Sequence, residues 1–242
     1  MISLTIDRDA LIANIYAGDG KYDGPVSNGL PAFAFSPAEL RGYQKFDPKK
    51  ARELWAAAGS PFPVLRATTS LNIPPFATMT DFIAKQLEAN LPVRVKIETV
   101  DVATFVSRAV ETPANQWELF VAADAQAAQS PDYNSIAMYM AKGSAGVSWS
   151  FKEDSPNPDT AKLAKEMQRL GDLAAAAVKP EERKARLDDL QKFRLTSFGP
   201  WLSLPVSATA YSVVRKTLRN YPHQDTPSLF QLRAQDIWIA KT

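Results

Sequence analysis

The chain has 242 residues, 45% of them hydrophobic and 22% charged, which is enough for a buried core and typical of a globular protein. Its formal net charge is +2, and its basic residues form no clustered stripe, so we expect no nucleic-acid partner. Without Cys, and with His223 as the only His, the sequence excludes disulfides, thiolate zinc sites, cysteine nucleophiles and multi-histidine metal sites. No cofactor is expected.

Two features bear on the location of the protein in the cell. No stretch approaches the roughly 20 apolar residues that a membrane span needs. The first residues, MISL, have neither the basic start nor the long apolar run of a signal peptide. By themselves, these features favour the cytoplasm.

The pattern predicts one helix over residues 2–16, with an apolar stripe that ends before Gly18. No residue caps this helix at its start. Asp7 lies too far inside to cap it, unless the helix breaks there. The first element is therefore predicted to begin abruptly.

Residues 18–46 are rich in Gly, Pro and aromatic residues. Their polar content is too low for a free linker, so they are predicted to form a long ordered loop over the body of the protein. A helix then begins at Asp47-Pro48, with Asp as N-cap and Pro in the first turn, and runs to Gly59.

Strands and helices alternate in the next part of the chain. The predicted elements are a strand at 64–70, a helix at 76–90, a strand at 93–100, a helix capped by Asp101, and an apolar strand at 117–123. This β-α-β-α-β order favours an α/β sheet with helices packed on it.

The second half of the chain has two helical patterns, over residues 159–178 and from Pro180 to about residue 195. Late strands are predicted at 201–206 and 211–214, and the irregular tail ends in the apolar segment 236–239. Three tryptophans lie in helix or strand patterns and are predicted to be core residues: Trp55, Trp201 and Trp238.

Several segments resemble, in order, the solute-binding proteins of oligopeptide, dipeptide and nickel ABC importers (family 5). The matching segments are SLTIDRDALI at 3–12, FDPKKAREL at 46–54 with Ala58-Gly59, Gln86-Leu87, VRVKI at 93–97, Thr104-Phe105, Glu118-Leu119 with Pro131-Asp132, GPWLSLP at 199–205, and DIW at 236–238. No single motif is specific, but their order over almost the whole chain is.

The resemblance implies an α/β, periplasmic-binding-protein-like lobe in which a mixed sheet is flanked by helices. Residues 1–215 would form the C-terminal lobe, and residues 216–242 a tail that returns to a first lobe. That first lobe and the signal peptide would precede residue 1, which also accounts for the abrupt first helix. The implied role is delivery of a peptide, opine, sugar or metal chelate from the periplasm to the permease subunits of an ABC importer, without catalysis.

Two loops follow predicted strands at their carboxyl ends, where α/β sheets bind ligands. The loop after the first strand contains Asn72. The loop after the third strand offers a carboxylate and two amides, Asp124, Gln126 and Gln129, for a ligand cation and for hydrogen bonds. Trp149, in a later polar segment, is a candidate stacking surface. The structural alternatives are a helix cap for Asp124 and a packing role for Trp149.

In peptide-binding relatives, the loop after the third strand resembles GW..D, whose Asp pairs with the amino terminus of the ligand. Alignment on Pro131 puts Ala127 at the acidic position and Asp124 at the tryptophan position. Both signature residues are absent. The sequence therefore departs from ordinary peptide binding, unless Asp124 serves the amine from a shifted place.

Motifs of enzymes are absent: there is no G-x-S-x-G elbow, no glycine loop for phosphates or dinucleotides, and no set of paired metal ligands. Asp188 and Asp189 are adjacent on a charged helix, so they point in different directions and do not form a carboxylate pair. Two alternatives to a binding lobe are a truncated or stand-alone α/β module that acts through protein–protein contact, and an uncharacterised enzyme.

Overall fold

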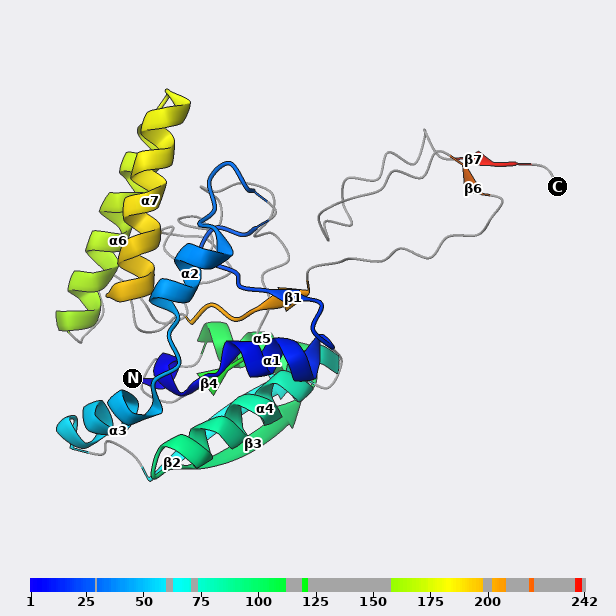
Figure 1. The fold of residues 1–242 in the computed structure, drawn as a ribbon, viewed down its shortest axis with the longest axis vertical. Helices are drawn as coiled ribbons and strands as arrows, with labels where there is room; N and C mark the ends of the chain where they lie inside the picture. The colour runs from blue at the N-terminus through cyan, green and yellow to red at the C-terminus, as the bar shows by residue number, and fades with distance from the viewer. Residues whose placement is uncertain are drawn as a thin grey trace.

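The computed structural model describes residues 1–28, 30–59, 63–70, 74–111, 119–121, 158–197, 202–207, 218–219 and 238–240 (Figure 1). Within these ranges the first part of the chain forms an α/β layer, and a helical hairpin projects from it (Figure 1).

The chain begins with two short helices instead of one. A 3-10 helix, η1 (Ile2–Thr5), is followed by α1 (Arg8–Ile15). Asp7 lies between them in an extended conformation, and its carboxylate accepts a hydrogen bond of 2.9 Å from the backbone N–H of Ala10. The prediction of a single uncapped helix is therefore wrong, because Asp7 breaks the run and caps the helix that follows it.

Residues 18–28 and 30–46 are ordered, as predicted, and their side chains Tyr22, Val26 and Phe35 are buried. They also contain a two-residue strand, β1 (Gly20–Lys21), and a helix, α2 (Pro37–Tyr43), that the loop prediction missed. The start of α2 is a capping box: the Ser36 hydroxyl accepts from the Glu39 N–H, and the Glu39 carboxylate accepts from the Ser36 N–H.

The helix predicted after Asp47 is confirmed as α3 (Pro48–Ala57). The Asp47 carboxylate accepts a hydrogen bond of 2.9 Å from the backbone N–H of Lys50. The helix ends before Gly59, whose φ of +76° suits a residue without a Cβ.

The alternation predicted for the next segment is confirmed. Its elements are β2 (Val64–Ser70), α4 (Pro74–Asn90), β3 (Arg94–Val100), α5 (Val102–Glu111) and β4 (Leu119–Phe120). The three strands form a parallel sheet in the order β3-β2-β4. The α/β class is thus confirmed, and the described antiparallel pairs lie outside this sheet: β1 with β5 (Val206–Ser207), and β6 (Leu218–Arg219) with β7 (Trp238–Ile239).

One face of the sheet forms the main hydrophobic core with α4, α3 and the N-terminal helices. Leu65 on β2 and Val121 after β4 pack there against Ile83 and Leu87 of α4, together with Trp55 of α3. Trp55 is 2% exposed, which confirms its prediction as a core residue.

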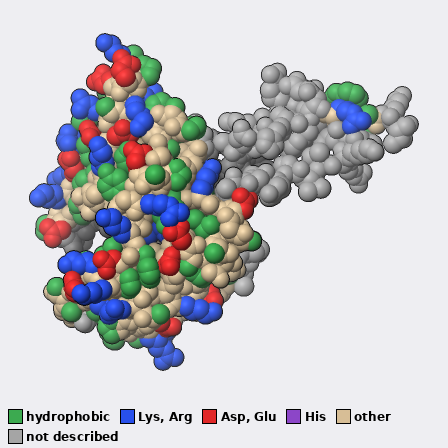
Figure 2. Space-filling model, viewed as in Figure 1, with side chains coloured by type: hydrophobic (Ala, Val, Ile, Leu, Met, Phe, Trp, Pro, Cys, Tyr) green, Lys and Arg blue, Asp and Glu red, His purple; other side chains and the backbone are tan. Residues whose placement is uncertain are grey.

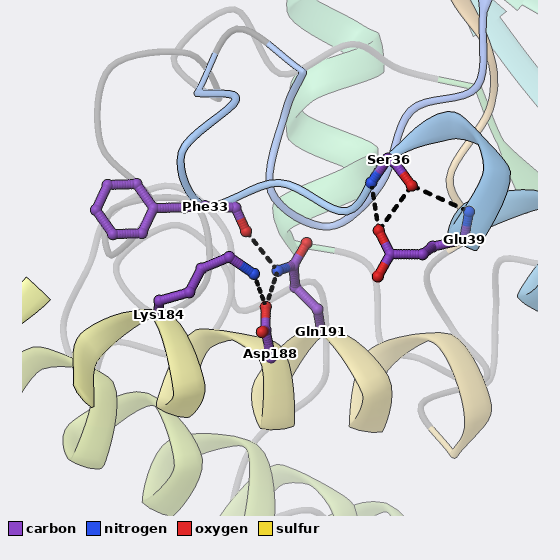
Figure 3. Close-up of polar contacts among 6 residues, drawn as sticks. All are labelled: Phe33, Ser36, Glu39, Lys184, Asp188 and Gln191. Atoms are coloured by element: carbon purple, nitrogen blue, oxygen red, sulfur yellow. Dashed lines mark hydrogen bonds and ion pairs between the residues drawn. The ribbon is translucent and has the colours of Figure 1, made fainter. Parts of the chain in front are cut away.

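A second core forms within a helical hairpin, α6 (Pro158–Ala176) and α7 (Pro180–Thr196), from residues such as Met167 and Leu187. The buried Gln191 of α7 donates a hydrogen bond of 3.0 Å to the carbonyl oxygen of Phe33 (Figure 3). On the same helix, Lys184 pairs with Asp188 at 2.5 Å. The hairpin is thus attached to the loop that precedes α2.

Residues 202–207 run along the first 21 residues of the chain. The Arg8 guanidinium donates to the carbonyl oxygen of Ser203 at 3.1 Å, and the Tyr16 hydroxyl is 3.2 Å from that of Pro205. Of the strand predicted over 201–206, residues 202–205 are not in a strand, and β5 begins only at Val206. These two carbonyl groups accept hydrogen bonds from side chains rather than from a neighbouring strand, and Pro205 has no N–H to donate.

Trp238 is 56% exposed, so its prediction as a core residue is wrong. It lies in β7, which pairs within the described residues only with β6, apart from the α/β layer (Figure 1). Trp201 and the strand predicted at 211–214 lie outside the described residues.

Candidate functional site

The carboxyl ends of the three parallel strands meet at one edge of the sheet. Ser70, the last residue of β2, pairs with Val100, the last residue of β3, and Thr68 pairs with Phe120 of β4. In open α/β sheets, this edge is where loops and helix N-termini hold ligands. Because β2 is central, the segments that follow β2 and β4 leave the sheet from neighbouring strands.

The central strand ends in three buried polar residues, Thr68, Thr69 and Ser70, which are at most 8% exposed. Among the residues that the structure describes, the Thr69 hydroxyl has no hydrogen-bond partner, which is costly for a buried polar group. The sequence analysis did not single out these residues. The signal was the change, within one strand, from apolar residues to three consecutive hydroxyl side chains.

Asp101 follows β3 at the same edge and caps α5, as predicted. Its carboxylate accepts hydrogen bonds from the Thr104 N–H at 3.0 Å and from the Thr104 hydroxyl at 2.6 Å. The hydrogen bond from the Thr104 side chain is the main reason that the pKa of Asp101 lies below its usual value. Asp101 is therefore ionised at neutral pH, with both oxygens occupied by the cap.

Aromatic packing fixes α5 against the sheet. The ring of Phe105 in α5 meets that of Phe120 in β4 edge to face, with 5.4 Å between ring centroids. This contact fixes the position of α5 relative to the end of β4, where the candidate loop after β4 begins.

All five predicted site residues lie outside the described residues. Asn72 falls in the segment 71–73, which follows β2. Asp124, Gln126, Gln129 and Trp149 fall in the segment 122–157, which follows β4. The described strands place the starting points of these two segments side by side, and the role of each side chain stays a prediction.

A hollow of about 630 Å³ lies along α6. Within the described part of the chain it has only this one helix as a wall, through Pro158, Ala161, Lys162, Lys165, Glu166 and Arg169. It contains no residue of the sheet edge and no predicted site residue.

Within the described ranges, the Asp and Glu side chains form no group of three suited to a metal ion. None of the helices described has the length and apolarity to cross a membrane. On the face shown in Figure 2, basic and acidic side chains are interspersed over the described surface.

A family model decides the relationship suggested by the fold. The model of bacterial extracellular solute-binding proteins, family 5, middle region, matches residues 2–146. The chain belongs to this family. Family 5 proteins bind solutes outside the cytoplasm, so the chain is an exported protein, and the cytoplasmic location favoured by its first residues and by the lack of an apolar span is wrong. No curated protein matches the sequence.

Solved structures of family 5 proteins share the fold at low sequence identity. The oligopeptide-binding protein AppA of Bacillus subtilis, in complex with a nonapeptide, is 14% identical with a TM-score of 0.65, over 99% of this chain and 46% of AppA. The murein tripeptide-binding protein MppA of Escherichia coli is 15% identical with a TM-score of 0.69, over 100% of this chain and 44% of MppA. NikA of Staphylococcus aureus, in complex with Ni(L-His)2, is 16% identical with a TM-score of 0.56, over 80% and 38%. The chain thus spans less than half the length of these proteins.

Four of the segments that resemble family 5 in sequence meet at one place in the fold, here called the junction: residues 3–8, Asp47, Gln86 and residues 202–205. The Asp47 N–H donates to the Leu4 carbonyl oxygen at 2.9 Å, and the Asp7 N–H donates to the Gln86 side chain at 2.7 Å. Arg8 reaches Ser203 in the last of these segments. These motifs therefore hold the scaffold together, which is why they identify the family without identifying the ligand.

Proposed function

We propose that this chain is a ligand-binding lobe of a periplasmic solute-binding protein that delivers a peptide or a similar small solute to an ABC importer. The observation that carries the proposal is the family 5 match over residues 2–146, in a fold that starts two candidate loops from neighbouring parallel strands. Residues 1–215 would act as the C-terminal lobe, and residues 216–242 as the tail that returns to a first lobe.

In this proposal the solute lies between the carboxyl edge of the sheet and the first lobe. Contacts with both lobes favour the closed state, because a ligand stabilises the state that binds it better. The closed protein then docks on the permease subunits of the importer, and hinge opening releases the solute.

Each predicted side chain would make the kind of contact with the solute that its chemistry favours. Asp124 would pair with a cation or amine of the solute, and the amides of Asn72, Gln126 and Gln129 would satisfy its polar edges. Trp149 would stack on a flat part of the solute. Because Ala127 stands where peptide-binding relatives have an acid, Asp124 would serve the amine from a shifted position.

Calorimetric titration of the chain with trialanine and with N-acetyl-trialanine tests this assignment. One wall of a cleft binds weakly, so we expect a Kd of about 1 mM or weaker for the free amine. Asp124→Ala should weaken trialanine binding by about tenfold, the effect of losing about 1.4 kcal/mol, and leave the acetylated peptide unchanged.

The matched control is Asp81→Ala, which removes an exposed carboxylate that pairs with Lys85 on α4. It should leave both affinities unchanged. If the Asp124→Ala variant binds trialanine as well as the unaltered chain does, Asp124 does not bind the amine, and its alternative role as a helix cap is favoured. Tight binding of trialanine to this chain alone would contradict the need for a second lobe.

A further inference from the structure

Strand β3 is an outer strand of the parallel sheet. Among the described strands it pairs with β2 alone (Figure 1). It has seven residues, of which five are exposed, and Ile97 in its middle is 41% exposed. Edge strands are usually very short or covered, because their backbone groups can pair with another chain. The outer side of β3 is therefore a surface on which a further strand can pair.

The backbone of β3 directs alternate residues toward β2 and toward the outer side. The Arg94 N–H donates to the carbonyl oxygen just before β2 at 2.9 Å, so it points inward. The Val95 N–H donates to the Glu88 carboxylate of α4 at 2.8 Å, so it points outward. Ile97 and Thr99 follow Val95 at intervals of two residues. Their N–H and C=O groups consequently point outward as well.

The charged side chains on either side of Ile97 are opposite in sign. Lys96 precedes it and Glu98 follows it, and both are exposed on the face of the sheet that carries α5. Arg108 of α5 pairs with one oxygen of Glu98 at 2.7 Å, and this hydrogen bond is the main reason that the pKa of Glu98 lies below its usual value. Glu98 is therefore ionised at neutral pH, and its second oxygen can accept from another cation.

This arrangement of charges is complementary to itself. If two β3 strands lie antiparallel with Ile97 opposite Ile97, each Lys96 lies opposite Glu98 of the other strand. These positions form a non-hydrogen-bonded pair, in which side chains are closest, and opposite charges there stabilise the pairing. A slide by two residues in either direction would instead place Lys96 opposite Lys96 or Glu98 opposite Glu98. The charges therefore favour one register.

We propose that β3 pairs with β3 of a second copy of this chain, antiparallel and with a two-fold axis at Ile97. The Ile97 and Thr99 N–H groups would donate to the Ile97 and Val95 carbonyl oxygens of the second copy. The Val95 N–H keeps its bond to Glu88, which ends the pairing there. The exposed Ile97 side chains would pack together on the face opposite the charges.

Charges on an edge strand can also prevent pairing. Protection of that kind works when the charges repel a second strand in every register, as a set of equal sign does. Lys96 and Glu98 repel in the shifted registers and attract in the one centred on Ile97. In that register Arg94 lies opposite Val100, which carries no charge. The charges therefore restrict the pairing rather than prevent it.

The inference does not depend on the proposed solute. Strand β2 separates β3 from β4 in the sheet, so the outer side of β3 lies away from the point where the candidate loop after β4 begins. Association of the chain and binding of trialanine are separate measurements, and failure of one leaves the other in place.

Sedimentation equilibrium of the whole chain, from about 10 µM to about 1 mM, measures the association. Pairing through one strand buries less area than a stable interface of about 1,200 Å² or more, so we expect a Kd of about 0.1 mM. Lys96→Glu places Glu opposite Glu, and Glu98→Lys places Lys opposite Lys. Each substitution should weaken the dimer about tenfold or more.

An equimolar mixture of these two variants distinguishes pairing through β3 from an effect of net charge. Each Glu of the Lys96→Glu chain then meets a Lys of the Glu98→Lys chain, so the mixture should associate about as strongly as the unaltered chain. The control Lys162→Glu changes the net charge as Lys96→Glu does, but on the exposed surface of α6. It should leave the Kd unchanged.

Amide hydrogen exchange of the unaltered chain gives a test that needs no variant. The Ile97 and Thr99 N–H groups should exchange about fourfold more slowly at about 1 mM than at about 10 µM, because the dimer protects them. The Val95 N–H, already bonded to Glu88, should not change.

Three results would overturn the proposal: a chain that is monomeric at about 1 mM, a dimer that neither charge reversal weakens, and a mixture of the two variants that stays monomeric although each has the Tm of the unaltered chain. If a variant does not fold, the exchange experiment decides. Exchange of the Ile97 N–H at a rate independent of concentration would then exclude the pairing.

Discussion

The side-chain oxygen of Gln86, in α4, accepts a hydrogen bond of 2.7 Å from the backbone N–H of Asp7, 79 residues earlier in the chain. Asp7 is also the N-cap of α1. Asp7 thus caps α1 with its carboxylate and donates its backbone N–H to a side chain of α4. The position of α1 on the α/β layer depends on this contact between two segments that resemble family 5.

Replacement of Gln86 by Leu should lower the free energy of unfolding by about 1–2 kcal/mol, because the Asp7 N–H loses its acceptor in a partly buried place. Urea unfolding measures the change. Gln86→Glu retains an acceptor and should recover most of the loss. Equal destabilisation by both substitutions would contradict the role of this hydrogen bond.

Replacement of Arg8 by Met should destabilise the protein by about 3 kcal/mol or more. Arg8 is 1% exposed and donates hydrogen bonds to oxygen atoms of Ser3, Ile6, Gln44 and Ser203. Hydrogen bonds from a charged group are worth about 1.5–3 kcal/mol each. The adjacent Asp9 pairs with Arg41 on the surface, so Asp9→Asn should cost less than about 1 kcal/mol in the same urea experiment. Similar costs for both variants would show that the junction does not depend on Arg8.

Replacement of Trp55 by Ala should cost about 3–5 kcal/mol, because it leaves a large cavity in the main core. The neighbouring Leu54 is 39% exposed, so Leu54→Ala should cost about 1 kcal/mol or less. Thermal unfolding of the two variants, followed by circular dichroism, gives the comparison. A small effect at residue 55 would mean that α3 is not part of the core.

Asp23 should make the protein less stable as the pH rises from acid to neutral. Burial of its carboxylate raises the pKa above 3.8, although hydrogen bonds from Asn28 favour the ionised form. The folded state therefore holds the proton more tightly than the unfolded state. The resulting stabilisation is fully present below pH 3.8 and is lost as the pH rises through the folded-state pKa.

The Asp23→Asn variant has no such group and can still accept a hydrogen bond from Asn28. Its stability relative to the unaltered protein should therefore increase between about pH 4 and about pH 7, as measured by urea unfolding at each pH. A difference that stays constant or shrinks over this range would contradict the raised pKa.

Local signals in the sequence predicted the elements that depend on local interactions. Asp47 and Asp101 cap the helices that follow them, since each carboxylate reaches a backbone N–H three residues ahead. The missed helix α2 had the same kind of signal, in Ser36 and Glu39, but the Gly and Pro residues around it favoured a loop. The break at Asp7 was missed because the apolar stripe continues through it.

Long-range contacts were not predictable in this way. Nothing in the sequence near Arg8 indicates that its partner is Ser203, and nothing near Trp238 indicates that β7 pairs only with β6 among the described strands. For the candidate site, the sequence predicted that loops after β2 and β4 lie at one edge, and the strand register brings their starting points together. The geometry of Asn72 and Asp124 depends on segments that periodicity does not specify.

The hydrogen bond between Arg8 and Ser203 joins residues 195 positions apart. A ribosome that adds about 5–20 residues per second makes the second of them roughly 10–40 s after the first. During that interval the guanidinium group of Arg8 has only water and part of its final set of carbonyl groups to bind. The junction therefore cannot close until Ser203 has been made, and water takes the place of the Ser203 carbonyl group until then.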